Sequence, residues 1–175
     1  CLDHFEVRRM TDPCNDGHDD TVFGPTVVFC CEDVGDTVMV VFSAVDCYGN
    51  ANTCMVTAIV NDKLPPTLVS CPPNKRITCD WYASNLEIPL NDLAPDQVAQ
   101  SEYLDSYFGV ATFYDNCDFE LIRTTNINLD QCLEGVITRN FKAVDEKGNQ
   151  SAGNGCTQQI FVDHVSDWEI GRASC

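Results

Sequence analysis

Twelve cysteines are the residues with the most chemistry in this 175-residue chain. Such a number is typical of an oxidising, extracellular compartment, where thiols pair as disulfides. Zinc binding is the competing interpretation, because thiolates are favoured zinc ligands. However, the sequence has no C-x-x-C pair, and its histidines (His4, His18 and His164) fall at no ligand spacing. We therefore expect structural disulfides without a redox role.

An acidic segment, 12–20 (D-P-C-N-D-G-H-D-D), could hold a cation. Carboxylates on a sharply turning backbone with a glycine are what a calcium loop needs. The closing position of such a loop is occupied by Phe23 instead of an acid, so a solvated acidic loop remains the alternative. Calcium is the one cofactor that the sequence admits, and its candidate ligands are Asp12, Asp16, Asp19 and Asp20.

Two further patterns could suggest catalysis. Asp46 and Asp145 each stand three residues before a Gly-Asn pair, where an acid normally accepts backbone N–H groups of a turn. Cys14 and His18 could form a nucleophile and base, but a disulfide would consume the thiol and no orienting motif accompanies the pair. We expect no catalytic residues and no enzymatic activity.

The chain contains an internal repeat. The pattern F-x-A-V-D-x-x-G-N occurs at 42–50 and again at 141–149. Cysteines follow the same register: Cys54 matches Cys156, Cys31 matches Cys132, and Cys1 with Phe5 matches Cys117 with Phe119. A repeated unit is one folding module. We therefore expect the back part of a first repeat at 1–62, a complete repeat at 63–162 and the first strand of a following repeat at 163–175.

Hydrophobic alternation predicts an all-β fold. Val38, Val40 and Phe42 would share one strand face, and turn residues separate many short strands. This pattern favours immunoglobulin-like β-sandwich modules in tandem. One short helix is expected near 96–103, after Pro95. The 62–66 connection contains two prolines, which predicts a semi-rigid joint between modules.

Composition excludes several partners. The formal net charge is −17, from 27 acidic and 10 basic residues. Such a chain repels nucleic acid and anionic lipid, and it attracts divalent cations. It has no apolar run long enough to cross a bilayer, so we expect no membrane insertion.

One arrangement of residues resembles a known module. A D-x-x-G-N turn, a cysteine, a strand ending in Asp62, the Pro65-Pro66 pair, then Cys71-Pro72 and Cys79 resemble the hyalin repeat (HYR) and HYR-like modules. Asp115-Asn116-Cys117 and Cys132 resemble the variant found in tandem in large cell-surface adhesins of Bacteroidota, including gliding-motility adhesins. The resemblance covers nearly the whole chain. It implies an immunoglobulin-like fold, extracellular adhesion and no enzymatic activity.

The same resemblance implies a set of disulfides. It pairs Cys71 with Cys156 and Cys117 with Cys132. By analogy, Cys1 pairs with Cys30 or Cys31, and Cys14 reaches Cys47. Cys54, Cys79 and Cys175 are then left for partners outside their own repeats.

Taken together, these patterns predict a structural segment of a secreted cell-surface adhesin or filament, which acts as a stiff, disulfide-stapled stalk. Its partners would be neighbouring repeats of the same polypeptide or filament. The alternative is a recognition module that binds a protein partner or surface glycans, with or without calcium, through the aromatic segment 81–108 or the acidic segment 12–20. Glycosylation motifs fall on Thr21, Thr37 and Asn149.

Overall fold

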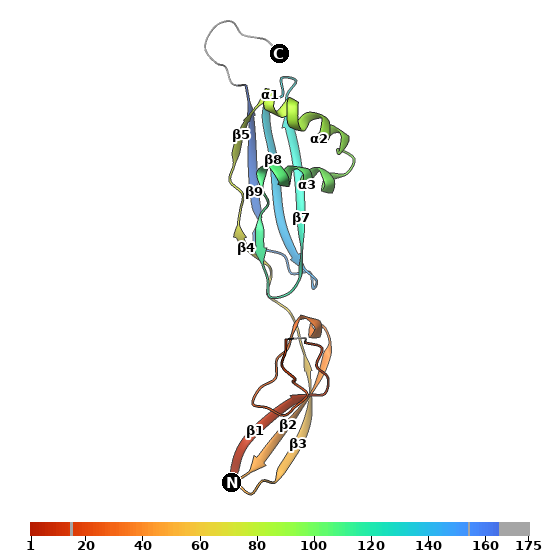
Figure 1. Cartoon of the computed structure of the whole chain (residues 1–175), viewed down its shortest axis with the longest axis vertical. Coiled ribbons are helices and arrows are strands. Elements are labelled where there is room, and N and C mark those ends of the chain that lie inside the picture. The colour runs from red at the N-terminus through yellow and green to blue at the C-terminus, as the bar shows by residue number, and fades with distance from the viewer. Residues whose placement is uncertain (15, 154, 165–175) are drawn as a thin grey trace. The chain divides into compact units, whose positions relative to one another are not determined.

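The computed structural model describes residues 1–14, 16–153 and 155–164 (Figure 1). The chain divides into two compact units, Cys1–Lys63 and Leu64–Cys175, called unit 1 and unit 2 below. The mainly β character that the alternation predicts is confirmed, with several separate sheets. The expected first strand of a following repeat (163–175) lies almost entirely outside the described residues.

Unit 1 is built on a three-stranded antiparallel sheet. Its strands are β1 (Leu2–Arg9), β2 (Thr37–Asp46) and β3 (Ala51–Ile59), in the order β1-β2-β3. The long segment 10–36 joins β1 to β2 and contains one short 3₁₀ turn, Cys31–Asp33. At its middle this segment bridges to the edge of the sheet, where Val7 and Gly24 exchange two backbone hydrogen bonds of 2.7 and 3.0 Å.

Unit 2 contains a four-stranded sheet and a small second sheet (Figure 1). The larger sheet has the order β5 (Lys75–Thr78), β9 (Cys156–Asp163), β8 (Gly135–Asp145) and β7 (Phe119–Leu129). Its strand β5 runs parallel to β9, and the other pairs are antiparallel. The small sheet pairs β4 (Thr67–Ser70) with β6 (Thr112–Tyr114).

Helices occupy the segment between β5 and β6. They are α1 (Cys79–Tyr82), a π-helical turn (Ala83–Glu87), α2 (Ile88–Asp92) and α3 (Gln97–Phe108). The predicted helix is confirmed in position, since Asp96 caps α3 by accepting the backbone N–H groups of Val98 and Ala99. The helical residues 79–92 were not predicted.

The core of unit 2 lies on one face of the four-stranded sheet. Along β8, every second residue from Ile137 to Asp145 is buried. One cluster packs Ile137 of β8 and neighbouring residues of β9 under the helices, against Leu86, Leu90 and Leu104. A second cluster packs Phe141 and its neighbours against Phe113 of β6. The layer over the sheet therefore combines helices with a two-stranded sheet, and an immunoglobulin-type sandwich remains a prediction.

The repeat found in the sequence forms the same hairpin in each unit. In β2 and β3, Phe42 lies opposite Cys54, and in β8 and β9, Phe141 lies opposite Cys156. On the other side, Phe5 pairs with Ala44, while Leu121 pairs with Ala143. The structural equivalent of Phe5 is therefore Leu121, and the match to Phe119 is wrong by two residues.

Candidate functional site

The two repeated aspartates build matching turns. In unit 1, Asp46 accepts hydrogen bonds from the backbone N–H groups of Tyr48 and Asn50 (2.8 and 2.9 Å) and from the Asn50 side-chain amide (2.9 Å). In unit 2, Asp145 accepts the N–H groups of Lys147 and Asn149 (2.9 and 2.8 Å) and the Asn149 side-chain amide (2.7 Å). Each carboxylate is held by its own turn, which is the role that the sequence pattern indicates.

These contacts set the acidity of both groups. Hydrogen bonds from the Asn50 side chain and backbone are the main cause that lowers the pKa of Asp46 below its ordinary value. At Asp145 burial raises the pKa, but the hydrogen bonds from Asn149, Lys147 and Gly148 together outweigh it and lower the pKa. Both acids therefore remain ionised acceptors, which suits a turn and not proton donation.

The four carboxylates proposed for calcium do not converge. Asp12 accepts the N–H groups of Cys14 and Asp20 (both 3.1 Å), and Asp16 accepts that of His18 (2.8 Å). Asp19 accepts the N–H of Thr21 (3.0 Å), and Asp20 accepts the N–H of Val28 (2.8 Å) and contacts the His18 ring (3.0 Å). No three of these four acids have ligand atoms within metal-binding reach of one another in the described part of the chain. Their carboxylates shape the loop as separate turn acceptors.

The longer segment 10–36, which contains these acids, is anchored by a buried arginine. Arg9, at the end of β1, is fully buried and pairs with Asp33, which is 2% exposed. Arg9 also donates to the carbonyl of Val28 (2.7 Å) and lies 3.2 Å from the sulfur of Cys14. Through these contacts the end of the sheet holds three separate points of the 10–36 segment.

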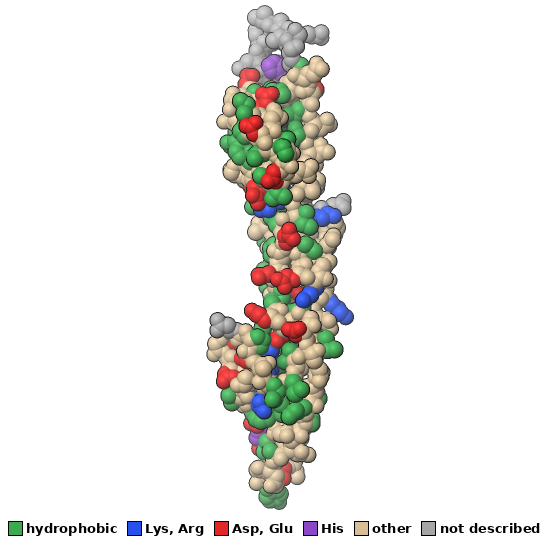
Figure 2. Space-filling view, turned by 90° about the vertical axis from the view of Figure 1, so that its right-hand side faces the viewer, with side chains coloured by type: hydrophobic (Ala, Val, Ile, Leu, Met, Phe, Trp, Pro, Cys, Tyr) green, Lys and Arg blue, Asp and Glu red, His purple; other side chains and the backbone are tan. Residues whose placement is uncertain are grey.

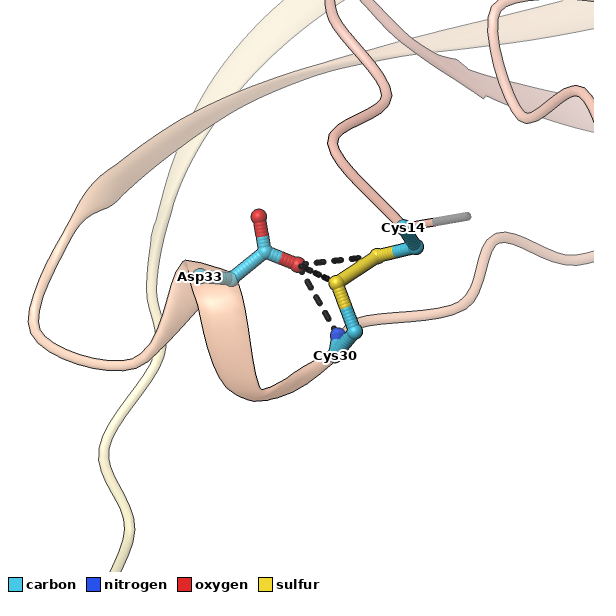
Figure 3. Close-up of side chains that lie close together, drawn as sticks. All are labelled: Cys14, Cys30 and Asp33. Carbon is cyan, nitrogen blue, oxygen red and sulfur yellow. Dashed lines mark hydrogen bonds between the residues drawn. A yellow bond between two sulfur atoms is a disulfide. The ribbon is translucent and has the colours of Figure 1, made fainter. Parts of the chain in front are cut away.

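A possible metal-binding group in unit 1 consists of Cys14, Cys30 and Asp33 (Figure 3). The two cysteines form a disulfide, so neither offers a thiolate. The carboxylate of Asp33 accepts the N–H of Cys30 at 2.9 Å and lies 3.6 and 3.5 Å from the two sulfurs. Because the guanidinium of Arg9 already neutralises Asp33, this arrangement fits a covalent staple and not a cation site.

The disulfides agree with the expected set in part. Cys71 and Cys156 are bonded across 85 residues, the pair that the family resemblance implies. In unit 1 the expected pairing is wrong: Cys1 bonds to Cys47 and Cys14 bonds to Cys30. The reason is strand pairing, because β1 and β2 place Leu2 opposite Asp46 and so bring the neighbouring cysteines together. Cys31, Cys117 and Cys132 are also disulfide-bonded.

Two cysteines of the described chain are free thiols, Cys54 and Cys79. Cys79 is buried in the helix-covered core, and burial is the main cause that raises the pKa of its thiol. A buried thiol of raised pKa is unreactive. Cys54 lies on β3 and is exposed.

Unit 2 has its own buried arginine, which sequence reasoning missed. Arg139 of β8 is 1% exposed and pairs with Asp105 of α3. It also donates to the side-chain oxygen of Gln158 (2.8 Å) and to the carbonyl of Gly109 (2.9 Å). The sequence could have indicated this burial, because Arg139 is two residues from both Ile137 and Phe141 and therefore lies on the same buried face of β8. Arg139 therefore ties the helices to the sheet as Arg9 ties the segment 10–36 to its sheet.

The aromatic segment 81–108 mostly fills the core. Tyr82 and Phe108 are buried, and Trp81 and Tyr103 pack against the same cluster. The rings of Trp81 and Tyr107 meet edge to face at 5.7 Å. Tyr107 is the member of this group that remains well exposed, at 42%.

The motifs for glycosylation lie at different kinds of site. Thr37 is exposed at the start of β2, while the hydroxyl of Thr21 donates to Asp19. The side-chain nitrogen of Asn149, which would carry a glycan, donates to Asp145 within the turn. Modification at these three residues remains a prediction.

Acidic side chains are scattered over both units on the face shown in Figure 2 and form no single block. No helix of the described residues has the length and apolar character needed to cross a membrane. No protein-family model matches the chain, and no curated protein matches its sequence. The resemblance to HYR-like modules therefore remains an expectation from the residue pattern alone.

Proposed function

We propose that this chain is a structural segment of a secreted cell-surface adhesin or filament, in which stapled repeat units form a load-bearing stalk. The observation that carries the proposal is the recurrence of one hairpin in both units, with its Phe–Cys pair and its Asp–Asn turn. A chain that repeats one structural hairpin, without a shared catalytic group in that hairpin, suits a structural role better than a catalytic one. Neighbouring repeats of the same kind are its natural partners.

The disulfides support a mechanical role because of what they span. The Cys71–Cys156 bond joins the segment after β4 to the start of β9, so tension cannot extend the chain between these two cysteines, which are 85 positions apart. The Cys1–Cys47 bond locks almost the whole of the β1-to-β2 region of unit 1. Covalent bonds at these positions would hold strands that force would otherwise separate.

Single-molecule force spectroscopy tests this proposal. With the chain tethered through its ends, we expect little extension from the locked segments when the disulfides are intact. Reduction should release roughly 300 Å from the Cys71–Cys156 loop and roughly 160 Å from the Cys1–Cys47 loop, at about 3.5 Å per residue.

A matched control is available in unit 1. Cys14–Cys30 is nested inside the Cys1–Cys47 loop, so removing it by Cys14→Ser with Cys30→Ser should leave the extension unchanged. If the intact chain already extends to its reduced length under moderate force, the load-bearing function is wrong.

A second function, glycan recognition, is supported by one feature. The face of the β7-β8-β9 sheet opposite the core carries polar residues, and a hollow there is lined by Ile122, Thr124, Asn140, Lys142 and Thr157. Hydroxyl and amide groups on an open sheet are suitable partners for sugar hydroxyls. A glycan array on the chain tests this function, with Asn140→Ala and Lys142→Ala as the variants that should lose any binding found.

A further inference from the structure

The equivalent hairpins of the two units differ in what covers them. In unit 2, Phe141 and Cys156 are 1% and 2% exposed, and Phe113 and Ala111 pack against them. In unit 1, their counterparts Phe42 and Cys54 are both exposed, with 41% of Phe42 accessible. Directly opposite residues of an antiparallel pair share a face, so Phe42 and Cys54 form one exposed patch.

The patch continues along the same face of unit 1. Phe5, 64% exposed, pairs with Ala44, next to the Phe42–Cys54 pair. Val56, also exposed, lies two residues beyond Cys54 on β3. The segment 10–36 is anchored to this face where Arg9 lies opposite Val40, and it leaves the Phe42–Cys54 pair exposed. We call this surface, formed by Phe5, Phe42, Cys54 and Val56, the Cys54 face.

Strand edges show the same difference. In unit 2, β5 pairs in parallel with the outer edge of β9, through Lys75–Ile160 to Thr78–Asp163. In unit 1, β3 is the last strand of its sheet, and all of its residues but Ala58 are exposed. A long exposed edge strand is a template for pairing with another segment.

Cysteine chemistry agrees with both differences. Cys156 is bonded to Cys71, which immediately follows β4 and precedes β5. Its counterpart Cys54 is a free, exposed thiol at the same position of the hairpin. One short segment, 67–78, thus supplies unit 2 with the disulfide to the hairpin, the partner of β6 and the edge strand on β9.

We infer that the Cys54 face binds a segment of the same chemistry as 67–78, carried by a neighbouring repeat: an extended strand, a cysteine that bonds to Cys54, and an edge strand that pairs with β3. The segment 67–78 of this chain is already used within unit 2, so an additional segment of this type is the occupant. This inference rests on the proposed function in taking neighbouring repeats as partners.

The covalent step balances as thiol–disulfide chemistry. Two thiols, Cys54 and the incoming cysteine, each lose a proton and together lose two electrons. A small-molecule disulfide of the extracellular medium accepts them and is released as two thiols. In the laboratory, a peptide cysteine carried as a mixed disulfide reacts directly: the Cys54 thiolate attacks the peptide sulfur, and the leaving group departs as a thiolate.

A peptide of residues 66–78 (PTLVSCPPNKRIT), with its cysteine activated by 2-thiopyridine, serves as the probe on the full chain. Docking raises the local concentration of the peptide sulfur. We therefore expect one adduct per chain, located at Cys54 by peptide mapping, formed at least about tenfold faster than with a scrambled peptide of the same composition. Phe42→Ser should remove most of this advantage, and Cys54→Ser should abolish the adduct.

A non-covalent measurement keeps the test independent of thiol reactivity. With Cys54→Ser and a peptide carrying serine for its cysteine, amide exchange in β3 should slow when the peptide is added, while exchange in β9 should not change. Equal rates for the two activated peptides, or unchanged exchange in β3, would overturn the inference. So would a dimer of two chains linked through Cys54 in preference to the peptide adduct. None of these results depends on the force response of the Cys71–Cys156 loop, so the two proposals fail separately.

Discussion

Units 1 and 2 use the same hairpin under different covers. Both have the Phe–Cys pair, the Asp–Asn turn and a buried arginine that binds a covering segment. In unit 2 the cover is a set of helices and a two-stranded sheet, and in unit 1 it is the irregular segment 10–36, closed by the Cys14–Cys30 bond. The repeated motif thus determines strand pairing and turn geometry, whereas burial depends on residues outside the motif.

The strongest test of this difference compares the two equivalent phenylalanines. Phe141→Ala should lower the free energy of unfolding of unit 2 by about 4 kcal/mol, because it leaves a cavity under Phe113. Phe42→Ala should cost unit 1 less than about 1 kcal/mol, because that ring is already 41% exposed. Hydrogen exchange measured separately on β8 and β2 resolves the two units. Equal losses would mean that the Cys54 face is covered in solution.

Sequence reasoning succeeded where the controlling interactions are local. The Asp46 and Asp145 turns and the Asp96 helix cap involve neighbours within four residues, so residue type and spacing were sufficient. It failed where partners are distant. The residues around Phe42 and Phe141 match in type, yet the two rings differ in burial. Phe113 and Ala111, which pack against Phe141, lie outside the repeated motif.

The missed features have specific physical reasons. The Cys1–Cys47 bond follows from the register of β1 on β2, which family analogy did not supply. The helical segment 79–92 was missed because Pro89 and Asn91 interrupt its pattern, although Leu86 and Leu90 pack it onto the sheet. The acids of the 12–20 segment match a calcium loop in composition, while in the structure each one accepts a different backbone N–H; calcium binding there remains a prediction.

The buried arginines give a second comparison. Arg9→Met should destabilise unit 1 by about 3 kcal/mol, because Asp33 would remain buried without its cationic partner. Arg139→Met should cost unit 2 less, about 2 kcal/mol, because Asp105 retains Arg123 at 2.9 Å. Urea unfolding followed by hydrogen exchange in each unit measures both. The reverse order would show that the Gln158 and Gly109 contacts of Arg139 matter more than the charge of Asp33.

Alanine substitution in the two shared turns should cost each unit a similar free energy of unfolding, unlike substitution of the residues that differ in burial. Gly49 and Gly148 have φ values of 82° and 85°, and a Cβ at either position would meet no atom within 4 Å. The cost of alanine is therefore backbone strain alone, about 1 to 2 kcal/mol in each unit. Gly24→Ala is the matched control, because that glycine is outside the positive-φ group and should tolerate the change. A twofold difference between the two turns would show that the units strain their hairpins differently.

The smallest effect concerns the pH response of the same turns. The pKa of both Asp46 and Asp145 is lowered in the folded chain, so each ionised carboxylate stabilises its unit at pH values above the ordinary Asp pKa of about 3.9. That contribution should disappear as the pH falls through the folded pKa, and Asp46→Asn or Asp145→Asn should flatten the acid limb of the corresponding unit. Carboxyl-carbon NMR titration measures the two pKa values directly. Because burial opposes the hydrogen bonds most strongly at Asp145, a value for Asp145 at or above the ordinary one, with Asp46 still lowered, would show that the cover of unit 2 changes the turn as well as the core.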